Sequence, residues 1–347
     1  MPTEAQHRQG VGARAWCRAD LAGGTLDIWP LGLLHPGART VNIALDLAVE
    51  IEMEPTGDVY RVRQGDSVVE TSTAAELSTT EEAALVGLIL DQLDIPPVEV
   101  RIESASPRGG GLGGSSALAV AIIAASEVVC GRAESSPQVR AALARDLEAR
   151  LMSLPTGRQD HFPAQLGGVL EVRHEPGGEQ IRQVLTDVPA LAAALLVVYS
   201  GRSHFSAGQN WRVIRNRFEG DTETIRCLDG IRDAAQGVVE ALEGCRLSEV
   251  GELMSQEWSW RRRLADGIST AEIEEILDVA TRAGAWGGKV CGAGGGGCLV
   301  MLCPPATRHD VERAVIEKGA EVLTTGLATE PLTVRPLAAS PRRRKGS

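Results

Sequence analysis

Residues 107–120, PRGGGLGGSSALAV, hold five glycines within positions 109–114, followed by two serines and an apolar run. The residues before them, VEVRIESASP from Val98, alternate between apolar and other side chains, which predicts a strand with one exposed face. Residues 117–129 are apolar on nearly every side, which predicts a buried helix. A glycine loop that opens a helix turns backbone N–H groups toward an anion, and the helix dipole adds positive charge there. We therefore expect a phosphate-binding loop, with a flexible turn as the alternative.

Two glycine-rich stretches satisfy the pattern G-x-G-x-x-G, at Gly109, Gly111 and Gly114 and again at Gly292, Gly294 and Gly297. A Rossmann dinucleotide site would need a buried parallel strand before the glycines, and the half-exposed strand from Val98 argues against one. A P-loop would need Gly-Lys-Ser/Thr, whereas Ser115 follows Gly114 with no lysine. What remains is a phosphate cradle that ends in two hydroxyls, where a serine can ligate a magnesium ion carried by a nucleotide.

The bulk composition is that of an ordinary globular protein. A chain of 347 residues is long for one compact core, so we expect one two-lobed unit or two domains that share a cleft. The formal net charge of -11 argues against nucleic acid or an anionic membrane as the main partner, because both would repel this surface. The short basic segment at residues 341–345 is expected to be a solvated terminus.

Cysteine usage and hydropathy bear on the compartment. The seven cysteines form no CxxC pair and have no histidine at zinc spacing, which favours reduced thiols. Residues 1–16 contain charges and no apolar segment typical of a signal peptide. No stretch reaches the roughly 18 apolar residues that a membrane helix needs. We expect a soluble, cytoplasmic protein.

The rest of the chain is expected to mix strands and helices, without a fixed-period repeat. Residues 40–53 and 298–302 predict strands, and residues 191–198 are interpreted as a buried strand or the start of a second lobe. Helical spacing predicts helices within residues 81–93, 137–154, 222–263 and 271–283.

Three separated motifs resemble those of the GHMP kinases, the family named for galactokinase, homoserine kinase, mevalonate kinase and phosphomevalonate kinase. They are RADLAGGTLD at residues 18–27, PRGGGLGGSSA at 107–117 and GGKVCGAGGGGCLVML at 287–302. Within the family, GRQD at 157–160 followed by the glycine pair 167–168 is similar to the sugar 1-kinase branch, which includes heptose 7-phosphate kinase and fucokinase. Three motifs in the family's order are far more specific than any one of them.

The resemblance implies an α+β, two-lobed GHMP kinase fold with the active-site cleft between the lobes. It implies an N-terminal lobe at residues 13–185, which carries the sugar motif and the nucleotide loop, and a C-terminal lobe at 186–337. We expect residues 1–12 to be disordered and residues 338–347 to form a basic disordered tail.

The chain departs from the family pattern at three positions. Gly114 is an extra residue before the serine pair, Trp16 stands where a proline is usual, and His161 stands where glutamine is common. These departures bear on the exact substrate more than on the reaction.

The resemblance also implies ATP-dependent phosphorylation of a sugar or sugar phosphate at the anomeric hydroxyl, with ATP and Mg²⁺ as cofactors. Phosphoryl transfer asks the protein mainly to position the acceptor hydroxyl and to offset charge on the γ-phosphate. Asp160 is the expected base for that hydroxyl, and Arg18 is the expected cation beside the phosphate. Asp27 offers carboxylate oxygens to sugar hydroxyls. Its neighbour Trp29 is interpreted as a core residue in preference to a stacking surface for sugar.

Each bound group has its own expected set of residues. The nucleotide-binding residues are Pro107, Gly109, Gly110, Gly111, Leu112, Gly113, Gly114, Ser115 and Ser116. The substrate-binding residues are Gly23, Gly24, Asp27, Arg158, Gln159, His161, Gly294 and Gly295. The magnesium ligands are Ser115, Ser116 and Glu148, with Ser116 preferred of the two serines.

Three rival functions stay open at this point. One is a GHMP kinase for a non-sugar alcohol, as in the mevalonate and homoserine branches, although Asp27 and the Gln159–Asp160 pair favour sugar. Another is a non-catalytic relative that binds nucleotide or sugar, which the presence of Arg18 and Asp160 disfavours. The third is a Rossmann oxidoreductase. The expected partner is a small-molecule sugar or sugar phosphate, with no nucleic acid and no membrane.

Overall fold

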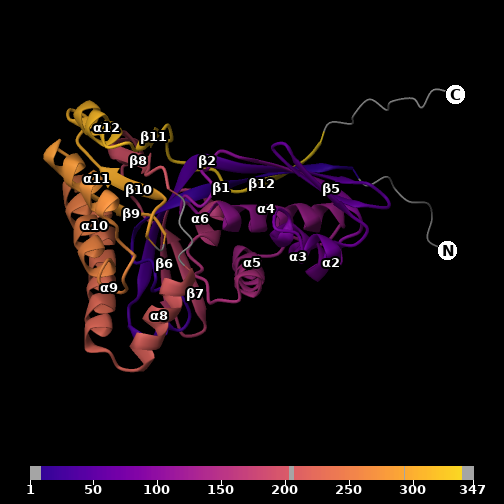
Figure 1. The fold of residues 1–347 in the computed structure, drawn as a ribbon, viewed down its shortest axis with the longest axis horizontal. Coiled ribbons are helices and arrows are strands. Elements are labelled where there is room, and N and C mark those ends of the chain that lie inside the picture. The colour runs from indigo at the N-terminus through magenta and orange to yellow at the C-terminus, as the bar shows by residue number, and fades with distance from the viewer. Residues whose placement is uncertain (1–8, 203–206, 293, 338–347) are drawn as a thin grey trace.

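The computed structural model describes residues 9–202, 207–292 and 294–337, whose strands form two sheets (Figure 1). The larger sheet has the order β12-β1-β2-β5-β3-β4, with β6 paired to β2 and β7 paired to β6. Its strands are β1 (Val11–Ala22), β2 (Arg39–Pro55), β3 (Tyr60–Gln64), β4 (Ser67–Thr71), β5 (Val98–Ser104), β6 (Val169–Glu175), β7 (Gly178–Gln183) and β12 (Thr333–Pro336). The smaller sheet has the order β11-β8-β10-β9 and consists of β8 (Leu195–Tyr199), β9 (Gly287–Val290), β10 (Cys298–Leu302) and β11 (Glu321–Leu323).

The long antiparallel pair β1–β2 is the frame of the larger sheet. β2 is long enough to pair with β6 through residues 39–43 and with β5 through residues 49–55. β5, the strand before the glycine loop, is antiparallel to β2 and parallel to β3. The antiparallel pairing that its alternation favoured is therefore present, in a mixed sheet.

Helices cover one face of the larger sheet and pack around the smaller sheet (Figure 1). Those in the first half of the chain are α1 (Leu31–Leu34), α2 (Ala74–Leu77), α3 (Ala84–Gln92), α4 (Gly114–Val129), α5 (Pro137–Met152) and α6 (His161–Leu166). Those that follow are α7 (Val188–Ala194), α8 (Ala207–Phe218), α9 (Thr222–Glu243), α10 (Leu247–Arg261), α11 (Ala271–Arg282) and α12 (Arg308–Glu317). α9 and α10 pack on each other, and α10 packs against β9 and β10.

Helix α4 is buried along most of its length because its side chains are small or apolar. It begins at Gly114, after Gly113 adopts a φ of 72°, a left-handed conformation that glycine reaches without steric cost. Alanines along the helix let it lie against β1 and β2. The predicted order of strand, glycine loop and buried helix is confirmed.

In the smaller sheet, β8, β9 and β10 are buried almost throughout, whereas the edge strand β11 is partly exposed. Along β8, Leu195 and Val197 belong to the hydrophobic cluster of the larger sheet, whereas Leu196 and Val198 belong to a second cluster with residues of α9, α10 and α11. A strand buried on both faces needs an unbroken apolar run. This requirement explains the apolar sequence around residue 195. The packing of Leu195 and Val197 in the cluster of the larger sheet holds the two sheets together.

The other predicted helices and strands match the structure except at one segment. The expected strands at 40–53 and 298–302 and the helices within 81–93, 137–154, 222–263 and 271–283 are present. The segment 191–198 divides, because α7 ends at Ala194 and β8 begins at Leu195.

Both ends of the described chain join the larger sheet. Residues 11 and 12 were expected in a disordered N-terminus, and this is wrong, because β1 starts at Val11 and pairs there with Met53 of β2 and Pro336 of β12. β12 itself comes from the end of the expected C-terminal lobe. The expected disorder of residues 1–8 and 338–347 lies outside the described residues, and the lobe boundary at 185–186 stays a prediction. No helix within the described ranges is long and apolar enough to cross a membrane.

Candidate active site

The glycine loop at residues 109–114 is held from both sheets. β1 donates one hydrogen bond to it, from Arg18 N to Leu112 O at 2.8 Å, and β10 donates another, from Cys298 N to Gly110 O at 2.7 Å. These two carbonyls therefore accept hydrogen bonds from backbone N–H groups. The start of α4, at Gly114, has no side chain that caps it among the described residues. A helix start of this kind favours an anion.

A cavity of about 1170 Å³, the loop cavity, runs along this loop. Of the nine predicted nucleotide-binding residues, all except Ser116 line it. The remaining lining residues are Arg18, Val49, Gln64, Gly65, Glu81, Glu82, Ile102, Glu103, Ser104, Ser106, Arg108, Leu118, Asp160 and Gly292. The structure thus brings the predicted phosphate cradle to the wall of a cavity large enough for a nucleotide.

A smaller cavity of about 160 Å³, the inner cavity, adjoins the loop cavity. The two share four lining residues, Arg18, Ser115, Asp160 and Gly292. The inner cavity is otherwise lined by Thr25, Asp27, Ile28, Ser116, Glu148, Met152, Thr156, Gly157, Gln159, Asn210 and Arg261. A group bound in one cavity would meet a group bound in the other at Arg18 and Asp160.

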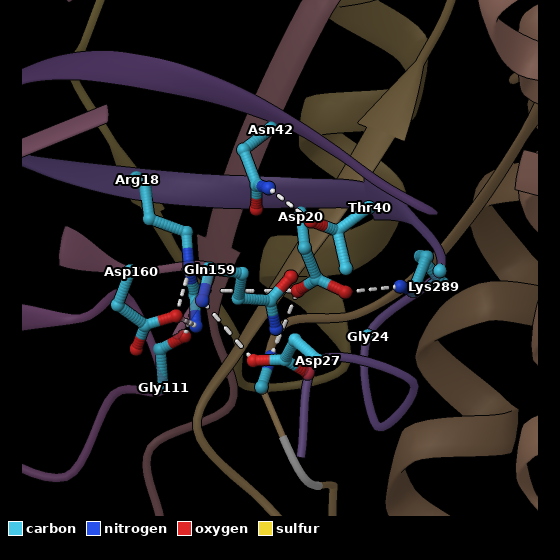
Figure 2. A network of polar contacts seen from close by, with 12 residues as sticks. Arg18, Asp20, Gly24, Asp27, Thr40, Asn42, Gly111, Gln159, Asp160 and Lys289 are labelled. Carbon is cyan, nitrogen blue, oxygen red and sulfur yellow. Dashed lines mark hydrogen bonds and ion pairs between the residues drawn. The ribbon is translucent and has the colours of Figure 1, made fainter. Parts of the chain in front are cut away.

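Arg18 and Asp160 form an ion pair at this shared wall (Figure 2). Arg18 Nε and Nη2 both donate to Asp160 Oδ1, at 2.8 and 2.6 Å, and Nη1 donates to Gly111 O at 2.6 Å. Burial alone would lower the pKa of Arg18, but Asp160 and Asp20 hold it above its ordinary value. Arg18 is therefore a fixed cation between the two cavities.

Asp27 is buried against the segment that leads to Asp160. Its Oδ2 accepts hydrogen bonds from the backbone N–H groups of Arg158, at 2.8 Å, and Gln159, at 3.1 Å. Gly157 allows this approach, because a Cβ there would lie 1.8 Å from the same oxygen. Burial and the negative charge of Asp160 raise the pKa of Asp27 to about 6. Of the predicted substrate residues, Asp27 and Gln159 thus line the inner cavity, whereas Arg158 contacts Asp27 through its backbone N–H and does not line it.

Glu148 joins the two serines at the start of α4. Ser115 Oγ donates to its Oε1 at 2.8 Å, and Ser116 Oγ contacts both carboxylate oxygens, at 3.1 and 3.0 Å. His161 Nε2 lies 2.7 Å from Oε2. Burial raises the pKa of Glu148, but His161 and the serines outweigh it and hold that pKa below its ordinary value.

The three predicted metal ligands therefore lie together, and His161 supports them. Its imidazole is buried against Glu148 and does not line the inner cavity, although a direct contact with the acceptor was expected. Within the described ranges no group of three His, Cys, Asp or Glu side chains could hold a metal ion. The arrangement fits a magnesium ion that arrives with a nucleotide, since such ions take only one or two protein carboxylates.

Four predicted glycines do not line the inner cavity. Gly24 packs against the side chains behind it, where a Cβ would lie 2.9 Å from Arg261 Nη2, and Gly23 lies against the backbone of Arg39. Gly294 packs on Ile268, and Gly295 N donates to the carbonyl of the same residue at 2.6 Å. In this structure these glycines shape the walls behind the site.

Sequence reasoning missed a buried cluster of charges behind Arg18, which we call the charge cluster: Asp20, Glu257, Arg261 and Lys289. Figure 2 shows the contact between Asp20 and Lys289. Lys289 Nζ donates to Asp20 Oδ2 and lies 3.2 Å from Glu257 Oε1. Burial works against ionisation of Asp20, yet Lys289, Arg18 and Arg261 hold its pKa below the ordinary value.

The charge cluster connects β1 with α10 and β9. Asp20 Oδ1 accepts a hydrogen bond from Gly292 N at 3.0 Å, and Arg261 donates to Thr25 Oγ1 at 3.0 Å and to Gly24 O at 2.9 Å. The first and third motifs are thus held against each other. The available signal was that two of these charged residues, Asp20 and Lys289, stand inside the first and third motifs. This signal does not reveal which charges pair.

Comparison with known proteins identifies the family. Residues 79–168 match the GHMP kinases N terminal domain, and residues 238–321 match the GHMP kinases C terminal domain. The chain is 30% identical over 271 residues to mevalonate kinase of Pyrococcus furiosus, covering 75% of this chain and 76% of that protein. It is 26% identical over 330 residues to the bifunctional fucokinase/GDP-fucose pyrophosphorylase of Arabidopsis thaliana, covering 88% of this chain. It spans about a third of the length of such bifunctional relatives.

Solved structures of low identity share the fold. The D-glycero-D-manno-heptose 1-phosphate kinase of Bacteroides thetaiotaomicron superposes with a TM-score of 0.75 at 18% identity, covering 95% of this chain and 100% of that one. Galactokinase of Lactococcus lactis superposes with a TM-score of 0.74 at 14% identity, covering 95% and 96%. The expected α+β GHMP kinase fold is confirmed. The chain belongs to the GHMP kinase family.

Proposed function

We propose that this kinase phosphorylates a sugar hydroxyl and, by its similarity to the sugar 1-kinases, the anomeric one. The observation that carries the proposal is the charge-compensated lining of the inner cavity. Two cations line this cavity: Arg18 forms an ion pair with Asp160, and Arg261 forms one with Glu257. A neutral polyhydroxyl acceptor suits this lining, whereas an acceptor that itself carries a carboxylate would enter without a free cation to meet it.

Unpaired oxygens in the inner cavity support the same substrate class. Gln159 Oε1 and Thr156 Oγ1 are buried and have no hydrogen-bond partner among the described residues. A buried oxygen without a partner is costly, and a hydroxyl group of an acceptor would supply a donor. Asp27 adds carboxylate oxygens on the same wall.

Asp160 is placed to accept the proton of the reacting hydroxyl. Both hydrogen bonds from Arg18 go to Oδ1, so Oδ2 is available to the acceptor. As the acceptor oxygen attacks the γ-phosphorus, its proton passes to Asp160 and the bond between the γ-phosphorus and the bridging oxygen of ADP breaks. Arg18 offsets the charge that spreads over the transferred oxygens.

The metal side of the site lies at Ser115, Ser116 and Glu148. Mg²⁺ bound there with the nucleotide would neutralise charge on the phosphate oxygens. The three oxygen donors meet the preference of this ion for oxygen, and His161 fixes the carboxylate from behind. Both serines contact Glu148, so the preference for Ser116 stays a prediction.

A non-sugar alcohol is the second candidate, because several relatives at about 30% identity are mevalonate kinases. The two candidates differ in charge, since mevalonate carries a carboxylate. One substrate panel therefore separates them.

The test is ADP release from ATP across neutral aldoses, uronic acids, heptose 7-phosphates, mevalonate and homoserine, followed by NMR of the product. We expect a neutral sugar to give the highest kcat/KM. A higher value for mevalonate or homoserine, or no acceptor-dependent ADP release with any sugar, would overturn the proposal.

Asp160→Asn tests the assigned base. Loss of a general base typically costs about 10²–10⁴-fold in rate, so kcat should fall within that range. Asp310→Asn is the control, because Asp310 is half exposed in a surface pair with Arg313. Equal kcat values for the two variants would contradict the assignment.

A further inference from the structure

Exposed aromatic side chains gather at one cavity beside the acceptor site. Trp29, Trp211 and Phe218 are 65%, 53% and 63% exposed, although the chain has only six tryptophans, two tyrosines and three phenylalanines. They line a cavity of about 760 Å³, the aromatic cavity, with Pro30, Ala149, Pro155 and Ile214 as further apolar walls. The interpretation of Trp29 as a core residue is therefore wrong. α8 contributes Trp211, Ile214 and Phe218 to the lining of the same cavity.

The aromatic cavity adjoins the inner cavity. Thr156 lines both. Arg158 links them as well, because its backbone N–H binds Asp27 while its side chain lines the aromatic cavity. A substituent on an acceptor held at Asp27 can thus extend past Thr156 toward Trp29.

The charges around the aromatic cavity are already paired. Arg215 donates to Glu219 at 2.8 Å, and Arg145 and Arg158 are bound to Asp146 and Glu179. Within the described part of the chain, each arginine of this lining is therefore already paired with a carboxylate, although Arg145 Nη1 and Arg158 Nε are buried without a hydrogen-bond partner. A cavity whose arginines are paired with carboxylates and whose aromatic rings are exposed suits an uncharged ligand group with an apolar face.

We propose that the aromatic cavity binds an uncharged ring carried by the acceptor, so that the substrate is a neutral sugar joined to a second ring. This inference rests on the proposed sugar kinase activity and narrows its substrate class. The ring is attached away from the hydroxyl that is phosphorylated, since that hydroxyl faces Asp160 at the opposite side of the inner cavity. Trp29, Trp211 and Phe218 supply the faces against which the ring stacks.

The experiment compares acceptors that share one reacting sugar: the bare sugar, its phosphate ester, a disaccharide and a phenyl derivative. Steady-state ADP release gives KM for each, and tryptophan fluorescence titration without ATP gives binding independently of turnover. We expect the disaccharide or the phenyl derivative to have a lower KM than the bare sugar, and the better of the two identifies the ring as sugar or aryl.

Trp211→Ala tests the cavity itself. Aromatic stacking of about 1 kcal/mol corresponds to roughly fivefold in affinity, so KM for the ring-bearing acceptor should rise at least that much more than KM for the bare sugar. Phe218→Ala should act in the same direction. Ile316→Ala, at an exposed apolar position on α12 that does not line the cavity, is the control and should change neither KM.

Three outcomes would overturn the inference while leaving the sugar kinase activity standing. The phosphate ester could be the preferred acceptor. Trp211→Ala could change KM for all acceptors equally or for none. Sedimentation could show a dimer that Trp211→Ala dissociates without affecting any acceptor KM, which would assign the aromatic rings to an interface between copies. If no sugar is phosphorylated at all, the proposed function itself fails.

Discussion

The charge cluster predicts that Lys289 stabilises the fold far more than an ordinary surface lysine. Lys289, Asp20 and Glu257 are completely buried. Removing one member of a buried ion pair typically costs about 3–5 kcal/mol, because a charge is left without compensation. Arg18 and Arg261 each remain 3.8 Å from an oxygen of Asp20, so we expect Lys289→Met to lose about 3 kcal/mol, near the lower end of that range.

Lys318→Met is the matched control, because Lys318 pairs with Glu275 at the surface, where both side chains are substantially exposed. Such pairs contribute about 0–1 kcal/mol. The assay is urea unfolding followed by circular dichroism, with the midpoint and the m-value compared for both variants. The double variant Asp20→Asn with Lys289→Met removes charges of both signs and should lose less than the two single variants combined. Equal losses for Lys289→Met and Lys318→Met would refute this reasoning.

Three further perturbations test the loop, the acceptor carboxylate and the metal side. Gly113→Ala, whose Cβ would lie 3.2 Å from the side chain of Asp160, should lower kcat about tenfold or more. The control is Gly131→Ala, because Gly131 also has a positive φ, of 63°, but its Cβ would meet no other atom of the described chain. This control should lose about 1–2 kcal/mol of stability, as Gly113→Ala should, but leave kcat unchanged. Because the pKa of Asp27 is raised to about 6, kcat/KM for the acceptor should fall as pH drops through that value, and a flat profile there would contradict the role. The folded state holds this proton more tightly than the unfolded state, so the contribution of Asp27 to the free energy of unfolding should decrease as pH rises from 3.8 to about 6. Glu148→Gln should raise the Mg²⁺ concentration for half-maximal velocity roughly tenfold, and an unchanged Mg²⁺ titration would remove Glu148 from the metal side.

Much of the candidate site was predictable because its signals are local. Gly113 must take a positive φ directly before a helix, and five glycines in six positions indicate such a loop without any distant contact. Arg18, Asp27 and Asp160 were found through short motifs whose residue types suit phosphoryl transfer. The structure then brings these three side chains to one wall, as expected from motifs that serve a single reaction.

The sequence by itself determined most of the helices and strands and the residue types of the candidate site, because backbone preference and residue type are properties of consecutive residues. Only the tertiary structure decided which charges pair and which rings stay exposed. Lys289 lies 269 positions from Asp20, and Trp211 lies 182 positions after Trp29 (211 − 29). Ion pairing and burial depend on distances between such segments, and the packing of α10 against β1 and β9 and of α8 against α9 sets those distances.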